Sequence, residues 1–177
     1  MKPEPDSRSA YAHFQPITTR WMDNDVYGHV NNVVYYSYFD TVVNTYLIRE
    51  GVLDIERGGT IGLVIETQCN YFSSLSFPDT VVAGLRVARL GNSSVRYEVG
   101  LFRNDDDVAA AQGHFVHVYV DRETRRPVAL PPALRQALQA LVVDRVVDRH
   151  DVHLAQDVEG EPSEFLVAQE VPRLQVA

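Results

Sequence analysis

The stretch from residue 31 to residue 51 constrains the fold of this chain more than any other. Asn31 or Asn32 is a suitable helix N-cap and Gly51 suits the position just past a helix end, so the sequence predicts a helix of about five turns. Polar residues form only a narrow stripe along this helix, and apolar side chains cover the rest of its circumference. Such a helix must be buried on most sides. We therefore expect one sheet to curl around it.

Four strand-like segments follow the predicted helix and are joined by short turns, which indicates an antiparallel meander. Ahead of the helix, the segment from Phe14 to Met22 is compatible with a first strand. The sequence thus predicts the α+β class, with a curved antiparallel β-sheet wrapped around a long central α-helix. The four later segments are residues 62–71, 80–90, 94–103 and 108–120.

The length of the chain, 177 residues, is that of one domain. Residues 1–13 are polar and contain prolines, so we expect a flexible N-terminal arm. Residues 14–140 form the expected domain, which ends with a short helix opened by Pro131-Pro132. Residues 141–177 form an acidic C-terminal extension of uncertain structure, with eight Asp and Glu against three Arg.

Several classes of partner and cofactor are disfavoured. The net charge is −8 and no basic stripe is present, so we expect no nucleic-acid partner. No apolar run approaches ~20 residues and the N-terminus lacks the apolar core of a signal peptide, so we expect a cytoplasmic protein that does not enter membranes. Cys69 is the only cysteine, which excludes an internal disulfide. His114 and His117 should point to opposite faces of one strand, which makes them a poor metal pair.

The densest polar motif lies immediately ahead of the predicted helix. Residues 20–32 read R-W-M-D-N-D-V-Y-G-H-V-N-N, with two acids, a glycine, a histidine and three asparagines. A carboxylate in such a loop can attack a thioester carbonyl or hold a water molecule as a general base. Free amides at a helix start can stabilise the negative charge that develops on the carbonyl oxygen. Taken alone, the same residues are also typical of ordinary turns.

This motif, followed by Tyr35 and Tyr38-Phe39, resembles the hot-dog-fold acyl-CoA thioesterases of the 4-hydroxybenzoyl-CoA thioesterase type. The resemblance extends over residues 14–140 and implies the hot-dog fold. It implies hydrolysis of an acyl-CoA to a free acid and coenzyme A, with no cofactor or metal beyond the coenzyme A of the substrate. It also implies a homodimer or homotetramer with sites between neighbouring subunits. Further similar segments are 70–71, 77–80, 89–94 and 117–121.

The resemblance places the catalytic carboxylate on Asp25, the second acid of the motif. Asp23 is interpreted as a structural partner of Arg20 or of loop amides. His29 either polarises the substrate or orients Asp25, or it only forms hydrogen bonds within the loop. Asn32 either assists catalysis or caps the helix.

Six further residues are expected to bind substrate. The first three flank the catalytic loop, where they would line the acyl tunnel, allow a close approach of the backbone or supply a helix-start amide. The last three surround a predicted turn that, by resemblance, lies near the phosphates of coenzyme A, although an ordinary solvated hairpin would look the same. The six are Tyr27, Gly28, Val33, Arg89, Ser93 and Ser94.

Two other functions remain open. One is a non-catalytic hot-dog domain that binds an acyl group or serves as an assembly subunit, against which the intact Asp25 argues. The other is an acyl-ACP thioesterase, which the resemblance weakens because residues 71–74, Tyr-Phe-Ser-Ser, lack the glutamate of that class. The identity of the acyl group is not determined by the motif.

Overall fold

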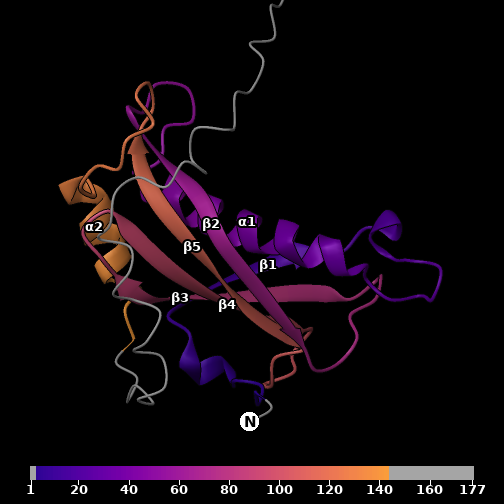
Figure 1. Cartoon of the computed structure of the whole chain (residues 1–177). Helices are drawn as coiled ribbons and strands as arrows, with labels where there is room; N and C mark the ends of the chain where they lie inside the picture. Colours follow the sequence, from indigo (N-terminus) through magenta and orange to yellow (C-terminus); the bar gives the residue numbers. More distant parts are fainter. Residues whose placement is uncertain (1–2, 144–177) are drawn as a thin grey trace, which may run out of the picture.

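A computed structural model describes residues 3–143 and contains one antiparallel five-stranded sheet with a long helix across one face (Figure 1). A short second helix follows the last strand. The elements in chain order are η1 (Arg8–Ala10), β1 (His13–Thr18), η2 (Trp21–Asp23), α1 (Asn32–Arg49), β2 (Thr60–Tyr71), β3 (Thr80–Leu90), β4 (Ser94–Arg103), β5 (Ala111–Asp121) and α2 (Pro132–Gln139).

The long helix α1 begins and ends where the sequence predicts. Asn31 is the N-cap, and its side-chain oxygen accepts a hydrogen bond of 3.2 Å from the backbone amide of Val33. Gly51 has a φ of +69°, the left-handed conformation that lets a chain leave a helix. The buried side of α1 packs on the sheet through Tyr35, Tyr38, Phe39, Val42, Val43, Tyr46 and Leu47.

The strand order β1-β3-β4-β5-β2 confirms the curved antiparallel sheet of the hot-dog fold but corrects its expected meander. Strands β3, β4 and β5 are neighbours in sequence order. Strand β2 is not beside β3, because β1 occupies that edge, with His13 opposite Leu85 and Thr18 opposite Thr80. Strand β2 pairs instead with β5 at the other edge.

The first strand is shorter than expected. It ends at Thr18, and residues 21–23 form a 3-10 turn rather than a continuation to Met22. The carboxylate of Asp23 accepts a hydrogen bond of 2.8 Å from the backbone amide of Arg20, which closes this turn. A side chain that bonds back to its own backbone competes with strand pairing.

Strand β2 has an irregular register and an unpaired outer edge. Val64 lies opposite His117 and Glu66 opposite Val116, so Ile65 forms a bulge and has no partner residue on β5. The side chains of Val64 and Ile65 are about half exposed at this edge. An edge strand with exposed apolar residues is a natural place for a second chain to pair.

The core between α1 and the sheet continues into α2. Leu134 and Leu138 of α2 are buried in it, together with Leu141 just beyond the helix. The backbone amide of Val87 donates a hydrogen bond of 2.9 Å to the carbonyl of Leu141. The packed structure thus extends slightly past residue 140, the expected end of the domain. The remaining part of the predicted acidic extension, residues 144–177, lies outside the described residues.

The segment expected to be a flexible arm makes specific contacts from Glu4 onward, where the backbone carbonyl accepts from Nε2 of Gln112 at 3.1 Å. Asp6 forms an ion pair of 2.8 Å with Arg86 on β3. The ring of Tyr11 lies over Gly84 and Gly100, where any Cβ atom would come within 2.8 Å of it. The two glycines therefore make room for an N-terminal segment that lies against the sheet.

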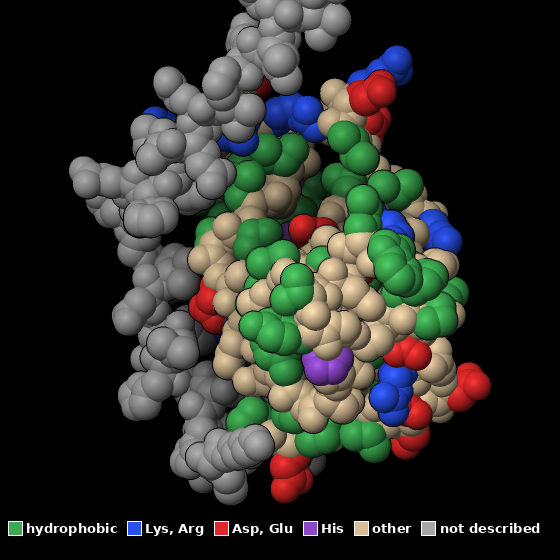
Figure 2. All heavy atoms as spheres, turned by 90° about the vertical axis from the view of Figure 1, so that its right-hand side faces the viewer, with side chains coloured by type: hydrophobic (Ala, Val, Ile, Leu, Met, Phe, Trp, Pro, Cys, Tyr) green, Lys and Arg blue, Asp and Glu red, His purple; other side chains and the backbone are tan. Residues whose placement is uncertain are grey.

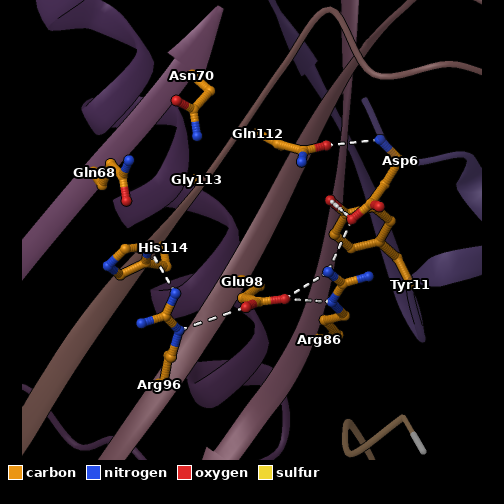
Figure 3. A pocket seen from close by; sticks show the side chains of 10 residues that line it. All are labelled: Asp6, Tyr11, Gln68, Asn70, Arg86, Arg96, Glu98, Gln112, Gly113 and His114. Atoms are coloured by element: carbon orange, nitrogen blue, oxygen red, sulfur yellow. Dashed lines mark hydrogen bonds and ion pairs between the residues drawn. The ribbon is translucent and has the colours of Figure 1, made fainter. Parts of the chain in front are cut away.

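A row of charged side chains crosses the face of the sheet opposite α1 (Figure 3). Arg86 donates to Glu98 at 2.7 Å, and Arg96 contacts Nδ1 of His114 at 3.2 Å. Nε2 of His114 bonds to Glu66 at 2.7 Å. Each group in the row has a partner of opposite or complementary character, so these charges cross-link β2, β3, β4 and β5.

No helix within residues 3–143 is long and apolar enough to cross a membrane. Within the same residues, no three His, Cys, Asp or Glu side chains come together as metal ligands.

Candidate active site

The first acid of the motif, Asp23, is a buried structural group. Its carboxylate accepts hydrogen bonds from Nε of Arg20 at 3.0 Å and from the hydroxyl of Tyr38 at 2.9 Å, besides the amide that closes the turn. Burial would raise the pKa of Asp23, but these hydrogen bonds and the charge of Arg20 outweigh it and leave the pKa lowered. The carboxylate is fully engaged by its own structure, as the sequence interpretation expected.

The second acid, Asp25, is arranged differently although it stands two residues away. Its backbone carbonyl accepts from the amide of Gly28 at 3.1 Å, and its amide donates to the carbonyl of His29 at 2.8 Å. Its Oδ1 atom accepts from the amide of Tyr27 at 2.8 Å and, at 3.4 Å, from that of His29. Both side-chain hydrogen bonds thus fix one oxygen, and within residues 3–143 the other oxygen is left for an incoming group.

The loop that carries Asp25 is held rigidly by the segment before β3. Val30 is buried, and its amide donates to the carbonyl of Leu75 at 2.8 Å. The hydroxyl of Ser76 donates to the carbonyl of Gly28 at 2.9 Å, and Asn24 accepts from the amide of Phe77 at 3.0 Å. Gly28 has a φ of +81°, so its conformation is required by the turn itself. The loop is therefore a fixed platform for the carboxylate.

The side chains around Asp25 are exposed and largely apolar. His29 and Tyr27 both project into solvent, and within residues 3–143 the His29 ring makes no hydrogen bond to the carboxylate. Figure 2 views the molecule from the end at which α1 begins and shows hydrophobic side chains gathered over this face. The exposed members of this group are Trp21, Met22, Val26, Tyr27, Val33, Tyr71 and Phe77.

The start of α1 supplies one amide to the site rather than two. The amide of Val33 is used by the N-cap Asn31, so the expected contribution of Val33 as a free donor is not seen. Asn32 is the first residue of the helix, where a backbone amide has no partner within the helix. Its carbonyl accepts from the hydroxyl of Tyr71 at 3.4 Å, which brings the end of β2 against the helix start.

The expected nucleotide-binding residues lie far from Asp25 within one protomer. Arg89, Ser93 and Ser94 surround the hairpin between β3 and β4, as predicted. The eleven residues of β3 separate this hairpin from the Asp25 loop by about 33 Å, at the usual rise of a strand. The hairpin is tied to the rest of the fold, since Arg135 donates to the carbonyl of Gly91 at 2.6 Å.

Cys69 faces the core, as expected, and it is not poised as a nucleophile. Burial raises the pKa of its thiol to about 11, so the thiol stays protonated at neutral pH. This protonated thiol leaves nucleophilic chemistry near the helix start to other side chains, among them Asp25 and His29.

His117, which the sequence predicts to be a poor metal ligand, has an environment that the sequence did not reveal. It lies on the α1 side of the sheet, between Phe115 and Tyr119 in the alternation of β5, whereas His114 lies on the opposite face. His117 lines a cavity between α1 and the start of β2. A histidine at an inward position of an aromatic strand was the signal in the sequence that could have identified it.

Comparisons with known proteins give a consistent match over this fold. A family model described as the thioesterase-like superfamily matches residues 19–138, which include the whole Asp25 loop. The crystal structure of the PA5185 protein from Pseudomonas aeruginosa is similar with a TM-score of 0.77 and 58% identity, over 79% of this chain and 98% of that one. The crystal structure of a thioesterase from Thermus thermophilus, solved with coenzyme A and Zn, is similar with a TM-score of 0.62 and 31% identity. The match covers 75% of this chain and 95% of that one.

A multifunctional relative is also similar. The L-carnitine dehydrogenase/betainyl-CoA thioesterase of Agrobacterium fabrum is 24% identical over 73% of this chain, which spans 26% of that protein.

Proposed function

The chain belongs to the thioesterase-like superfamily, and on that premise we propose that it hydrolyses an acyl-CoA thioester with Asp25 as the catalytic carboxylate. The observation that carries the proposal is the contrast between the two acids of the loop. The carboxylate of Asp23 is consumed by structural hydrogen bonds, whereas that of Asp25 is half-buried and held through one oxygen only. A carboxylate of the second kind can act on a substrate.

The proposed reaction uses the unengaged oxygen of Asp25 in one of two ways. The oxygen attacks the thioester carbon and expels the thiolate of coenzyme A, leaving an anhydride that water opens. Alternatively, it removes a proton from a water molecule as that water attacks the same carbon. Both routes consume one water and give the free acid and coenzyme A, and neither requires a metal or bound cofactor.

The negative charge on the carbonyl oxygen would be stabilised at the start of α1. The amide of Asn32 is the candidate donor, because it sits at the positive end of the helix dipole and has no partner within the helix. His29 would contact the thioester or the leaving group, which its exposure beside the turn supports. Tyr27 and Gly28 would line the path by which the substrate approaches.

We propose that two copies of the chain build each site together. If β2 pairs with its own copy about a two-fold axis over its full length, Thr60 of one strand lies opposite Tyr71 of the other. Tyr71 contacts the helix start beside Asp25, whereas Thr60 lies at the same end of the sheet as the Arg89 hairpin. The pairing would bring Arg89, Ser93 and Ser94 of one copy toward Asp25 of the other.

A thiol-release assay over a panel of acyl-CoAs, including short, medium and aromatic acyl groups, tests the proposed function. We expect turnover of at least one member by the purified full-length chain. A parallel series with the same acyl groups on acyl carrier protein separates the two thiols. Binding without turnover across both series would instead identify an acyl-binding subunit.

A further inference from the structure

A cavity of about 210 Å³ lies at the far end of the protomer from Asp25. It is bordered by the C-terminal half of α1, the loop that follows, and the adjoining ends of β2 and β5, and it opens to solvent. Its walls are mainly apolar and include Leu47, Leu53, Ile55 and Ile61. The volume is that of a small organic group rather than of a few water molecules.

The side chain of His117, which lines this cavity, has a ring nitrogen without a hydrogen-bond partner among residues 3–143. His117 is 6% exposed, and this nitrogen is its buried Nε2 atom. Burial lowers the pKa of His117 to about 4, so the ring is neutral at physiological pH. A buried polar atom without a partner costs free energy, so a ring that carries such an atom and also lines a cavity is a reason to look for a ligand.

Two other polar side chains of the cavity, Tyr119 and Arg122, already form hydrogen bonds within the fold. The hydroxyl of Tyr119 bonds to that of Tyr97 at 2.6 Å. Arg122 holds the loop after α1 by donating to the carbonyls of Gly58 at 2.6 Å and Ile55 at 2.8 Å. Asn44 also lines the cavity and donates to the carbonyl of Asp40 at 2.9 Å. Of the side chains that line the cavity, His117 is the one with a buried nitrogen that has no hydrogen-bond partner among residues 3–143.

A glycine keeps the space beside His117 open. A Cβ atom on Gly62 would lie 3.1 Å from Nδ1 of His117 and 3.3 Å from the ring of Tyr119. Gly62 is also exposed and belongs to the unpaired edge strand β2. The histidine is thus reached most directly from the edge at which a second copy would pair.

The cavity cannot serve Asp25 of the same protomer. The helix separates Asn31 from Asn44, which lines the cavity, by about 20 Å at 1.5 Å per residue. In the two-fold pairing of β2, however, Ile61 and Gly62 lie one strand spacing, about 4.8 Å, from the partner's end of β2 that abuts its helix start.

We propose that the cavity of each protomer receives the far end of the acyl group whose thioester is held by Asp25 of a second copy. The acyl group it selects is uncharged and mainly apolar and carries one hydroxyl or carbonyl oxygen that hydrogen-bonds to His117. This inference rests on the proposed thioesterase function and specifies its substrate class. A neutral imidazole offers one donor and one acceptor, so a hydroxyl can pair with either ring nitrogen.

Binding of non-hydrolysable substrate analogues tests the selectivity without relying on turnover. The probes are the thioether analogues of hexanoyl-CoA and of hexanoyl-CoA with a hydroxyl on carbon 4, 5 or 6, measured by calorimetry with the full-length chain. We expect one hydroxylated analogue to bind about tenfold more tightly than the unsubstituted one, as a single added hydrogen bond allows. His117→Leu should abolish this preference, and His117→Gln should retain part of it. His114→Leu, on the same strand but the other face, should leave it unchanged.

The possible results distinguish the proposed selection of the acyl group by the cavity from the proposed hydrolysis of the thioester. Equal binding of all four analogues by the wild type, or a preference that survives His117→Leu, would overturn the inference whether or not the protein hydrolyses thioesters. A preference that follows His117 in a protein without turnover would support the cavity and reject the proposed function.

Mixed assemblies test whether the cavity acts across two copies. A large excess of Asp25→Asn chains is refolded with His117→Leu chains, so that nearly every intact Asp25 faces a partner with an intact His117. We expect turnover from this mixture to favour the hydroxylated acyl-CoA, whereas His117→Leu alone shows no preference. Turnover that remains unselective in the mixture would place the cavity and Asp25 in the same protomer and contradict the proposal.

Discussion

At the scale of single residues, the environment of a carboxylate decides its role more than its place in the motif does. Asp23 and Asp25 lie in one loop but have different hydrogen-bond partners. The carboxylate of Asp23 accepts from a guanidinium, a backbone amide and a phenol, whereas that of Asp25 accepts from two backbone amides through one oxygen. The sequence predicted an interaction between the side chains of Asp23 and Arg20, because the two are three residues apart. It did not reveal Tyr38, whose contact depends on how α1 packs against the loop.

Acid should destabilise this fold partly through His117. Because the pKa of His117 falls to about 4 on folding, the unfolded chain binds more protons than the folded one between that value and about 6.5. The free energy of unfolding should therefore decrease as pH falls through this window, by up to about 3 kcal/mol from this residue. In His117→Leu, the free energy of unfolding measured with urea should decrease less between pH 7 and pH 4 than it does in the wild type.

His29→Leu, a change at an exposed histidine, is the control for this measurement. If His117→Leu and the wild type lose stability in parallel between the two pH values, His117 does not carry the effect.

At the scale of elements, local signals predicted most of the fold. The cap at Asn31, the left-handed Gly51 and the alternation in β3 and β4 are short-range patterns, and the structure follows them. The position of β2 at the edge beside β5 is a long-range choice, because any strand with one apolar face can pair on either side of a sheet. The bulge at Ile65 likewise depends on its neighbour across the pair.

The exposed edge of β2 predicts the effect of a charge placed there. In a two-fold pair, Ile65 of each copy lies next to Glu66 of the other near the axis, so Ile65→Glu would gather four carboxylates. We expect the wild type to assemble into dimers or tetramers of the 19.9 kDa chain and Ile65→Glu to be monomeric by light scattering. Val108→Glu, at an exposed apolar residue off this strand, should not change the mass. An unaltered mass for Ile65→Glu would remove β2 from the interface.

At the scale of the whole molecule, the candidate site is dispersed over a single protomer. The hairpin residues lie at one end of the sheet and Asp25 at the other, a separation that motif reading could not reveal. The proposed pairing of two copies would bring them together, so we expect assembly and activity to depend on one another.

Arg89→Ala tests whether the hairpin between β3 and β4 binds the phosphates of coenzyme A in the proposed two-copy site. Loss of a phosphate contact removes binding that is equal in the ground state and the transition state, so KM for acyl-CoA should rise about tenfold with kcat little changed. Arg103→Ala, which removes a surface arginine paired with Asp106, should leave both constants unaltered. A fall in kcat at constant KM would assign Arg89 to the chemistry rather than to coenzyme A.

Shortening the chain tests the boundary of the functional unit. A chain that ends after Val143 keeps Leu141, which is 2% exposed, and should assemble and turn over as the full-length protein does. Ending after Ala140 instead removes this leucine and should cost about 2–5 kcal/mol of stability in thermal unfolding. A 1–143 chain that assembles normally but has lost turnover would show that residues 144–177 complete the site.

The most direct test of the account is the turnover of Asp25→Asn. Asparagine keeps the oxygen that accepts the amide of Tyr27 but can neither attack as a carboxylate nor accept a proton from water. The control is Asp121→Asn, since Asp121 also accepts loop amides through one oxygen, from Glu123 at 3.1 Å and Thr124 at 2.8 Å. With assembly and melting unchanged in both, we predict that kcat falls by roughly 10²–10⁴-fold in Asp25→Asn and stays at the wild-type value in Asp121→Asn. If folded Asp25→Asn retains more than about a tenth of the wild-type kcat, Asp25 is not the catalytic carboxylate.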